Sequence, residues 1–180
     1  MISISNLVKQ YNNSTGDIVT VFDGFSVEFD QGTITAIIGS SGSGKTTLGR
    51  IVTGLDIQHS GSVAMGDQAL QQYLSHNRVG LIQQQYANFE WMNVYENITL
   101  GGVDSDFANH IINRLGLDPY RNFYPAQLSG GLQQRVAVAR ALFRRTDIIV
   151  FDEPFGGLDE ETRMNVLEFV QPLLRELSVT

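Results

Sequence analysis

The chain has 180 residues, 42% hydrophobic and 17% charged, which is enough for one packed domain and too few for two of ordinary size. Twelve Lys and Arg against 19 Asp and Glu give a net charge of −7, so we expect no nucleic-acid partner. The lack of cysteine excludes disulfides and thiolate metal sites and fits a reducing compartment. No apolar run approaches the ~18 residues that cross a bilayer, and no basic and apolar leader opens the chain, so we expect a soluble, unsecreted protein.

The N-terminal third predicts a hairpin followed by a strand, a loop and a helix. Apolar and polar residues alternate over residues 2–5 and again over 25–29, on either side of a polar turn at 12–17. Such alternation is typical of half-buried antiparallel strands. The β-branched run 33–38 predicts a further strand, and after a glycine-rich loop the pattern predicts a helix over 45–54.

The C-terminal part predicts alternating helices and strands. We expect a helix over about 129–144, an apolar strand over 148–151 and a helix over about 160–177. This alternation favours a mostly parallel sheet covered by helices. The stretch 97–127 contains short helical patterns, the clearest at 107–115, and indicates a helical insertion.

The loop after residues 33–38 carries the first chemical motif. Its letters GSSGSGKTT fit Gly, four free positions, Gly, Lys and Ser or Thr. Glycines let backbone N–H groups point at phosphate oxygens, and the following helix adds its positive end. A glycine-rich turn could match by accident, but its position between a predicted strand and helix favours nucleotide binding. The expected binding residues are Gly39, Ser40, Ser41, Gly42, Ser43, Gly44, Lys45, Thr46 and Thr47.

Within that loop two side chains have distinct expected roles. Lys45 would place its ammonium between the β and γ phosphates of a nucleotide, and the Thr46 hydroxyl would ligate Mg²⁺. Two adjacent carboxylates, Asp152 and Glu153, close the apolar strand 148–151. In a parallel sheet ligands lie beyond the carboxyl ends of the strands, which suits Asp152 to Mg²⁺ and Glu153 to polarising the attacking water. Alone, the pair would more readily be an acidic turn before Pro154.

A third motif, LSGGLQQR, opens the helix predicted at 129–144. Ser129 stands in N-cap position, and Gly130 and Gly131 expose backbone N–H groups, which makes a second anion site. By itself the segment is more readily explained as an ordinary capped helix. The order of GSSGSGKTT, a glutamine at Gln84, LSGGLQQR, IIVFDEP and GGLD resembles the nucleotide-binding subunit of ATP-binding cassette (ABC) transporters, most like the importer type.

The resemblance covers the chain from Ile2 to Thr180 and implies a fold and a chemistry. The implied fold is α/β: a P-loop NTPase with a mostly parallel sheet, an N-terminal antiparallel β subdomain and a small helical insertion at about 85–135, in one domain over 1–180. The implied cofactors are ATP and Mg²⁺. The implied activity is ATP hydrolysis coupled to transport, in the cytoplasm at the inner face of the cell membrane.

The resemblance also assigns roles to single residues. Tyr11 matches the aromatic residue that stacks on adenine, and Gln84 the glutamine that reaches the metal and the water. Ser129 and Gly131 match the signature residues of the family, which would contact the γ-phosphate held by a second subunit. Two chains, expected to be a homodimer, would thus sandwich two ATP molecules head to tail. Asp159 in GGLD would link the paired sites. The residues expected at this dimer junction are Ser129, Gly130, Gly131 and Asp159.

Residues 88–95 are the expected contact with a membrane permease. Phe89, Trp91 and Met92 stand there among polar neighbours and would form a groove for a short helix of that partner. The alternative is that these aromatic residues pack into the insertion itself. The insertion is compact and, with a tryptophan in this loop, looks most like import systems for small anions or sulfonates.

One departure from the family pattern leaves two function classes open. The family carries a γ-phosphate-sensing histidine after the helix that follows GGLD, and none of the three histidines stands there. We expect the C-terminal strands of the family fold to be missing. The first class is therefore an ATP-hydrolysing transport subunit, and the second is an ATP-binding module with little or no turnover, a fragment or a regulatory relative.

Overall fold

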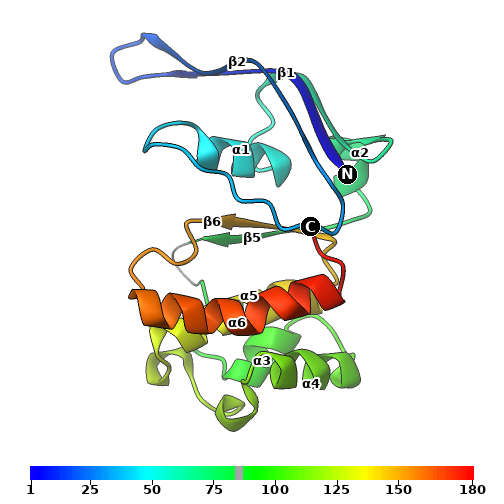
Figure 1. Ribbon diagram of the computed structural model, residues 1–180, viewed down its shortest axis with the longest axis vertical. Coiled ribbons are helices and arrows are strands. Elements are labelled where there is room, and N and C mark those ends of the chain that lie inside the picture. Colours follow the sequence, from blue (N-terminus) through cyan, green and yellow to red (C-terminus); the bar gives the residue numbers. More distant parts are fainter. Residues whose placement is uncertain (84–86) are drawn as a thin grey trace. The chain divides into compact units, whose positions relative to one another are not determined.

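The computed structural model describes residues 1–83 and 87–180. The chain divides into two compact units, residues 1–79 with Thr180 and residues 80–179, and each is described by itself (Figure 1). In chain order the elements are β1 (Ile2–Asn12), β2 (Ile18–Phe29), α1 (Lys45–Val52), β3 (Ser60–Met65), β4 (Gln68–Ala69), α2 (Leu70–Leu74), β5 (Val79–Gln83), α3 (Val94–Thr99), α4 (Ser105–Arg114), the 3₁₀ turns η1 (Asp118–Tyr120) and η2 (Pro125–Gln127), α5 (Gly130–Phe143), β6 (Ile148–Asp152) and α6 (Glu160–Glu176).

The first unit is built on an antiparallel sheet with strand order β2-β1-β3-β4. The expected hairpin is confirmed, because β1 pairs with β2 on either side of the polar turn at 13–17. Ile2 and Ile4, alternate residues of β1, are buried, and Ile51 of α1 is fully buried in the same unit. The alternation in the sequence therefore has its usual cause, one apolar face turned to a core.

A bulge interrupts the alternation of β1. Ile4 faces Val27 and Leu7 faces Phe25, so β1 holds one residue more than β2 over this interval. The extra residue lies at Asn6, whose φ of 51° is left-handed, and opposite it Gly61 packs so closely that a β-carbon would lie 2.4 Å from the Asn6 carbonyl oxygen. The bulge shifts the inward face from even to odd residue numbers. Lys9 thereby faces inward and is buried.

The strand expected at residues 33–38 is wrong. These residues form no regular element, and no described strand pairs with them. Ile34, Ile37 and Ile38 are exposed to 48%, 50% and 94%. A β-branched run favours extended backbone, but a strand also requires a neighbour whose N–H and C=O groups pair with it. Residues 33–38 have side chains typical of a strand, but no described strand pairs with their backbone.

In the second unit two strands and a group of helices share one core. β5 and β6 pair and run in the same direction, as their arrows in Figure 1 show, and α5 contacts α3, α4 and α6. α5 is therefore apolar on most sides, with Val136, Val138 and Ala139 fully buried. The expected helices and strand of the C-terminal part are confirmed to within a few residues. Among the described helices, none is both long and apolar enough to span a bilayer.

Candidate functional site

The glycine-rich loop of the first unit is shaped by its contact with β2. It leads from residue 39 into α1, with Gly42 and Gly44 at φ of 78° and 95°. A β-carbon on Gly44 would lie 2.7 Å from Val21 Cγ1 and 2.9 Å from the ring of Phe22. Both the left-handed backbone and the lack of space require glycine here. Strand β2 of the hairpin thus packs against the loop at Gly44, while residues 39–43 are exposed.

The charged group of this loop is Lys45. Its Nζ donates hydrogen bonds to the carbonyl oxygens of Gly39 and Ser40, both at 2.9 Å, so the side chain folds back over the loop. The Ser43 N–H also donates to the Ser40 carbonyl, at 3.2 Å. Thr46 and Thr47 follow in the first turn of α1, which holds no acidic side chain. A cation and a helix N-terminus therefore occur together, as binding of a polyphosphate requires.

Tyr11 lies on β1 in the same unit as the loop. Its ring is 38% exposed, and its hydroxyl donates to Asp56 Oδ2 at 2.7 Å. The ammonium of Lys9 stands 4.5 Å from the ring centroid. The expected base-stacking residue is thus an ordered aromatic ring at the surface of the unit that holds the glycine loop.

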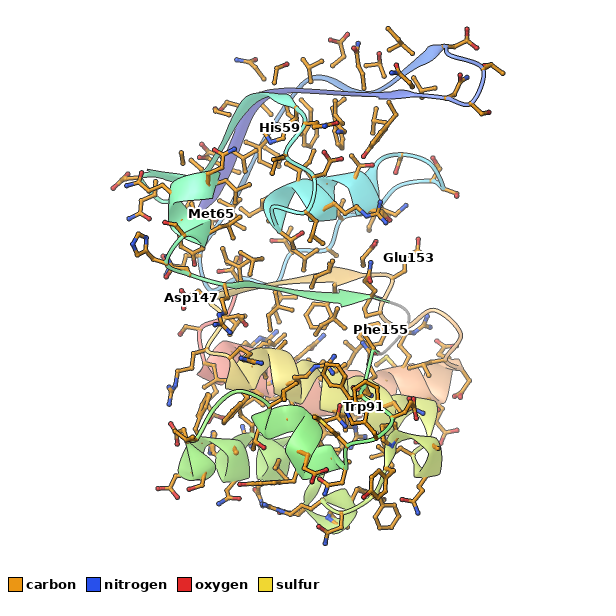
Figure 2. The ribbon with its side chains drawn as sticks, turned by 180° about the vertical axis from the view of Figure 1, so that it is seen from behind. His59, Met65, Trp91, Asp147, Glu153 and Phe155 are labelled. Carbon is orange, nitrogen blue, oxygen red and sulfur yellow. The ribbon has the colours of Figure 1, made fainter. Side chains whose placement is uncertain are left out.

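The carboxylate pair of the second unit stands at the carboxyl end of β6. Asp152 is the last residue of the strand, and Glu153 lies just beyond the arrowhead (Figure 2). Glu153 is exposed and has a φ of 50°, a left-handed conformation that costs a non-glycine residue roughly 1–2 kcal/mol. The turn after it closes by a hydrogen bond from the Gly156 N–H to the Glu153 carbonyl, at 3.0 Å. Backbone strain of this kind concentrates at functional sites.

The signature segment, LSGGLQQR at residues 128–135, and Asp159 both lie against Thr162. Ser129 is the N-cap of α5 and accepts from the Leu132 N–H at 3.4 Å. Asp159 caps α6 in the same way, accepting from the N–H and the hydroxyl of Thr162 at 2.8 and 2.7 Å. These hydrogen bonds from Thr162 hold the pKa of Asp159 below its usual value. A β-carbon on Gly131 would lie 2.8 Å from Thr162 Cγ2, so this glycine also permits the close contact of α5 with α6.

The loop before α3 is held by a buried asparagine. Asn97 is fully buried and accepts from the Phe89 N–H at 2.8 Å, while its amide donates to the carbonyls of Phe89, Met92 and Asn93 at 3.1, 2.8 and 3.0 Å. The rings of Phe89 and Trp91 stand 5.3 Å apart. Trp91 is 71% exposed and lies over the helical part of the unit (Figure 2).

The chain is similar to known proteins in sequence. The family model described as ABC transporter matches residues 22–156, three quarters of the chain. The chain belongs to the ABC transporter family. The sulfate/thiosulfate import ATP-binding protein CysA of Bradyrhizobium diazoefficiens is 38% identical over 99% of this ABC chain and 54% of its own length. A protein of the same name, CysA 2, from Shewanella oneidensis is 37% identical over 96% of this chain and 52% of its own length. The chain thus spans about half the length of these curated relatives.

Solved ABC cassettes share the fold. A bacterial ABC transporter cassette solved as a dimer superposes with a TM-score of 0.81 and 28% identity, covering 100% of this chain and 85% of that one. A dimeric cassette in a post-hydrolysis state, bound to ADP and Pi, also gives 0.81, with 27% identity over 99% of this chain and 84% of that one. The expected fold class, a P-loop NTPase of the ABC type, is therefore confirmed.

The ABC chain carries its expected site residues in both units. Tyr11 and the glycine loop with Lys45 belong to the first unit, and the carboxylate pair, the signature segment and Asp159 to the second. Gln84 lies outside the described residues. Sequence reasoning missed three supporting residues, Lys9, Asp56 and Asn97. A lysine among inward-facing residues of β1 is the signal that could have indicated the first.

Proposed function

We propose that the protein binds and hydrolyses ATP, dimerises head to tail around it and energises transport through a membrane permease. The observation that carries this proposal is the glycine loop, where Gly44 fits against β2 only without a side chain and Lys45 folds over the loop carbonyls. A loop so built offers backbone N–H groups and one cation to phosphate oxygens.

Each proposed site residue has its own role in nucleotide binding. Lys45 leaves the carbonyls of the loop and pairs with the β and γ phosphates, while Tyr11 stacks on the adenine. The groups that would hold Mg²⁺, the Thr46 hydroxyl, Asp152 and Gln84, are all oxygen donors, the kind that this cation prefers. When bound, Mg²⁺ neutralises charge on the phosphates.

Glu153 is the proposed general base. It follows the last residue of β6, and its left-handed backbone sets the side chain apart from the direction of the strand. A carboxylate in this place would take a proton from the water that attacks the γ-phosphate. We infer that the strain at Glu153 is retained for this orientation.

The dimer junction is proposed at the starts of α5 and α6. Ser129 and Asp159 are exposed helix caps, and the positive ends of both helices suit the phosphate of a nucleotide held by a second copy. The two cassettes that match in fold were solved as dimers, which supports this arrangement.

The permease contact is proposed at residues 88–95. Asn97 fixes the backbone of this loop, and the exposed Trp91 offers an apolar surface to a short helix. The names of the relatives, sulfate/thiosulfate import proteins, favour an importer for a small oxyanion. A subunit of this kind would act at the inner face of the cell membrane.

Phosphate release by the purified protein tests the proposal. We expect Glu153→Gln to keep Mg-ATP affinity and to slow hydrolysis by about 10²- to 10⁴-fold, since the amide cannot accept the proton. Glu168→Gln, an exposed carboxylate in the middle of α6, is the matched control and should change neither. A parent that binds Mg-ATP and releases no phosphate would favour the second class, a binding module without turnover.

The dimer is tested separately by light scattering. Ser129→Arg places a bulky cation at the start of α5 and should abolish ATP-dependent dimers while Mg-ATP still binds to the single chain. Dimers formed by this variant as readily as by the parent would refute the head-to-tail arrangement.

A further inference from the structure

An ion pair between the buried Lys9 and the half-buried Asp56 lies against the ring of Tyr11. Lys9 is 2% exposed, and its Nζ donates to Asp56 Oδ1 and to the Gln58 carbonyl, both at 2.7 Å. The other Asp56 oxygen accepts the Tyr11 hydroxyl at 2.7 Å. Each oxygen of this carboxylate thus has a side-chain donor, and the three side chains form one connected network.

The network fixes the orientation of the Tyr11 ring. The backbone of Tyr11 pairs with Val19 of β2, the hydroxyl at the far end of the ring is bound to Asp56, and the Lys9 ammonium stands over one face at 4.5 Å from the centroid. With both ends of the side chain held, the ring keeps one orientation. With one face covered by the ammonium, a flat ligand has the opposite face on which to stack.

Asp56 also ties this ring to the phosphate-loop helix. The N–H groups of Leu55 and Asp56 both donate to the Arg50 carbonyl of α1, at 2.8 and 3.1 Å. α1 begins at Lys45, directly after the glycine loop. Helix α1 therefore connects two parts of the unit. The glycine loop precedes its first turn, and Asp56, which holds Tyr11, follows its last turn. The distance between the two parts is set by the length of α1.

The charge state of Asp56 agrees with this role. Burial raises the pKa of Asp56, but hydrogen bonds from Lys9, Tyr11 and the Gln58 N–H, together with the charge of Lys9, outweigh it and leave the pKa below its usual value. The carboxylate is therefore ionised, and an acceptor for both donors, throughout the neutral range.

We infer that Lys9 and Asp56 are positioning residues for nucleobase recognition, which hold Tyr11 in a stacking orientation before the nucleotide arrives. The inference rests on the proposed function, in which the glycine loop binds the triphosphate and Tyr11 the base. A ring that is ordered in advance loses little conformational entropy on binding, so the network increases affinity for ligands that carry a base and leaves affinity for phosphate alone unchanged.

Calorimetry with Mg-ATP and Mg-tripolyphosphate tests this difference on the whole protein. Tyr11→Ala should weaken Mg-ATP binding roughly tenfold or more, since stacking on the ring is lost. Asp56→Asn, and the milder Tyr11→Phe, should weaken it by about 3- to 10-fold, because the ring remains and only its anchor is lost. Mg-tripolyphosphate affinity should be the same in all. Gln10→Ala, an exposed neighbour bonded to Thr20, is the matched control.

The outcomes separate the inference from the function beneath it. If Tyr11→Ala weakens Mg-ATP binding and both Asp56→Asn and Tyr11→Phe leave it unchanged, the positioning role is refuted and the stacking role stands. If Asp56→Asn and Tyr11→Phe lower affinity for both ligands alike, their effect is on folding of the unit, and the inference fails. If Tyr11→Ala itself changes nothing, the proposed stacking is wrong and the inference falls with it.

Discussion

Gly131 offers a prediction whose size follows from the structure. A β-carbon at this position would lie 2.8 Å from Thr162 Cγ2 and 3.3 Å from Val166 Cγ2. Adding a methyl group to such a contact costs about 1–3 kcal/mol, and the higher helix propensity of alanine offsets up to ~1 kcal/mol of this. We expect Gly131→Ala to lower the free energy of unfolding by about 1–2 kcal/mol, which for a chain of this size lowers the Tm by about 2–8 °C.

A second substitution isolates the contact that is responsible. Thr162→Ser removes Cγ2 and keeps the hydroxyl that donates to Asp159 at 2.7 Å, so the cap of α6 is preserved. In the double variant the methyl groups no longer meet, and most of the lost stability should return, with a coupling energy of about 1 kcal/mol. Thermal unfolding followed by circular dichroism measures the four proteins of this cycle. If the two effects simply add, the contact with Thr162 is not the cause.

Three further predictions concern the loop cation, the loop before α3 and acid stability. Lys45→Ala should weaken Mg-ATP binding by roughly 10- to 150-fold, because charge-assisted contacts are worth ~1.5–3 kcal/mol, and calorimetry showing unchanged affinity would remove the phosphate role of the loop. Asn97→Ala should lower the fluorescence anisotropy of Trp91, the only tryptophan in the sequence, at temperatures below the unfolding transition, because the loop loses the side chain that holds it. A folded variant with the anisotropy of the parent would contradict this role of Asn97. Asp56 has a lowered pKa in the folded state, so its stabilising effect is present above its unfolded pKa of about 3.9 and is lost as the pH falls through the folded value. Chemical unfolding of Asp56→Asn should therefore show a smaller loss of stability between about pH 5 and pH 3 than the parent, and an equal loss would contradict this.

The sequence predicts the elements whose causes are local. The start of α6 is readable because Asp159 is followed three residues later by a threonine that it caps, and both features lie within one turn. The glycine loop can be predicted because the spacing of its glycines, lysine and threonine is itself typical of a phosphate-binding loop. The bounds of α5 are predicted to within a residue or two because they too are marked locally, by a serine N-cap at the start and basic residues at the end.

Features that depend on distant partners were not readable. β5 is a five-residue strand that contains Gly80, and its partner β6 comes more than sixty residues later. Residues 33–38 have the composition of a strand, but composition does not supply the neighbour on which a strand depends. The ion pair of Lys9 with Asp56 joins residues 47 apart in sequence, and no pattern in either segment indicates the other.

The bulge at Asn6 divides β1 into two halves whose side chains have different roles. Before it, Ile2 and Ile4 serve only the core, and after it the same face of the strand carries Lys9 and Tyr11. If the same residues were paired without the bulge, the second half of the strand would turn over, so that the lysine would meet solvent and the tyrosine would leave its anchor. The bulge between Ile4 and Lys9 is therefore as important to the network of Lys9, Asp56 and Tyr11 as any side chain between them. An engineer who transfers the hairpin to another scaffold would have to preserve the bulge as well as the residues on either side of it.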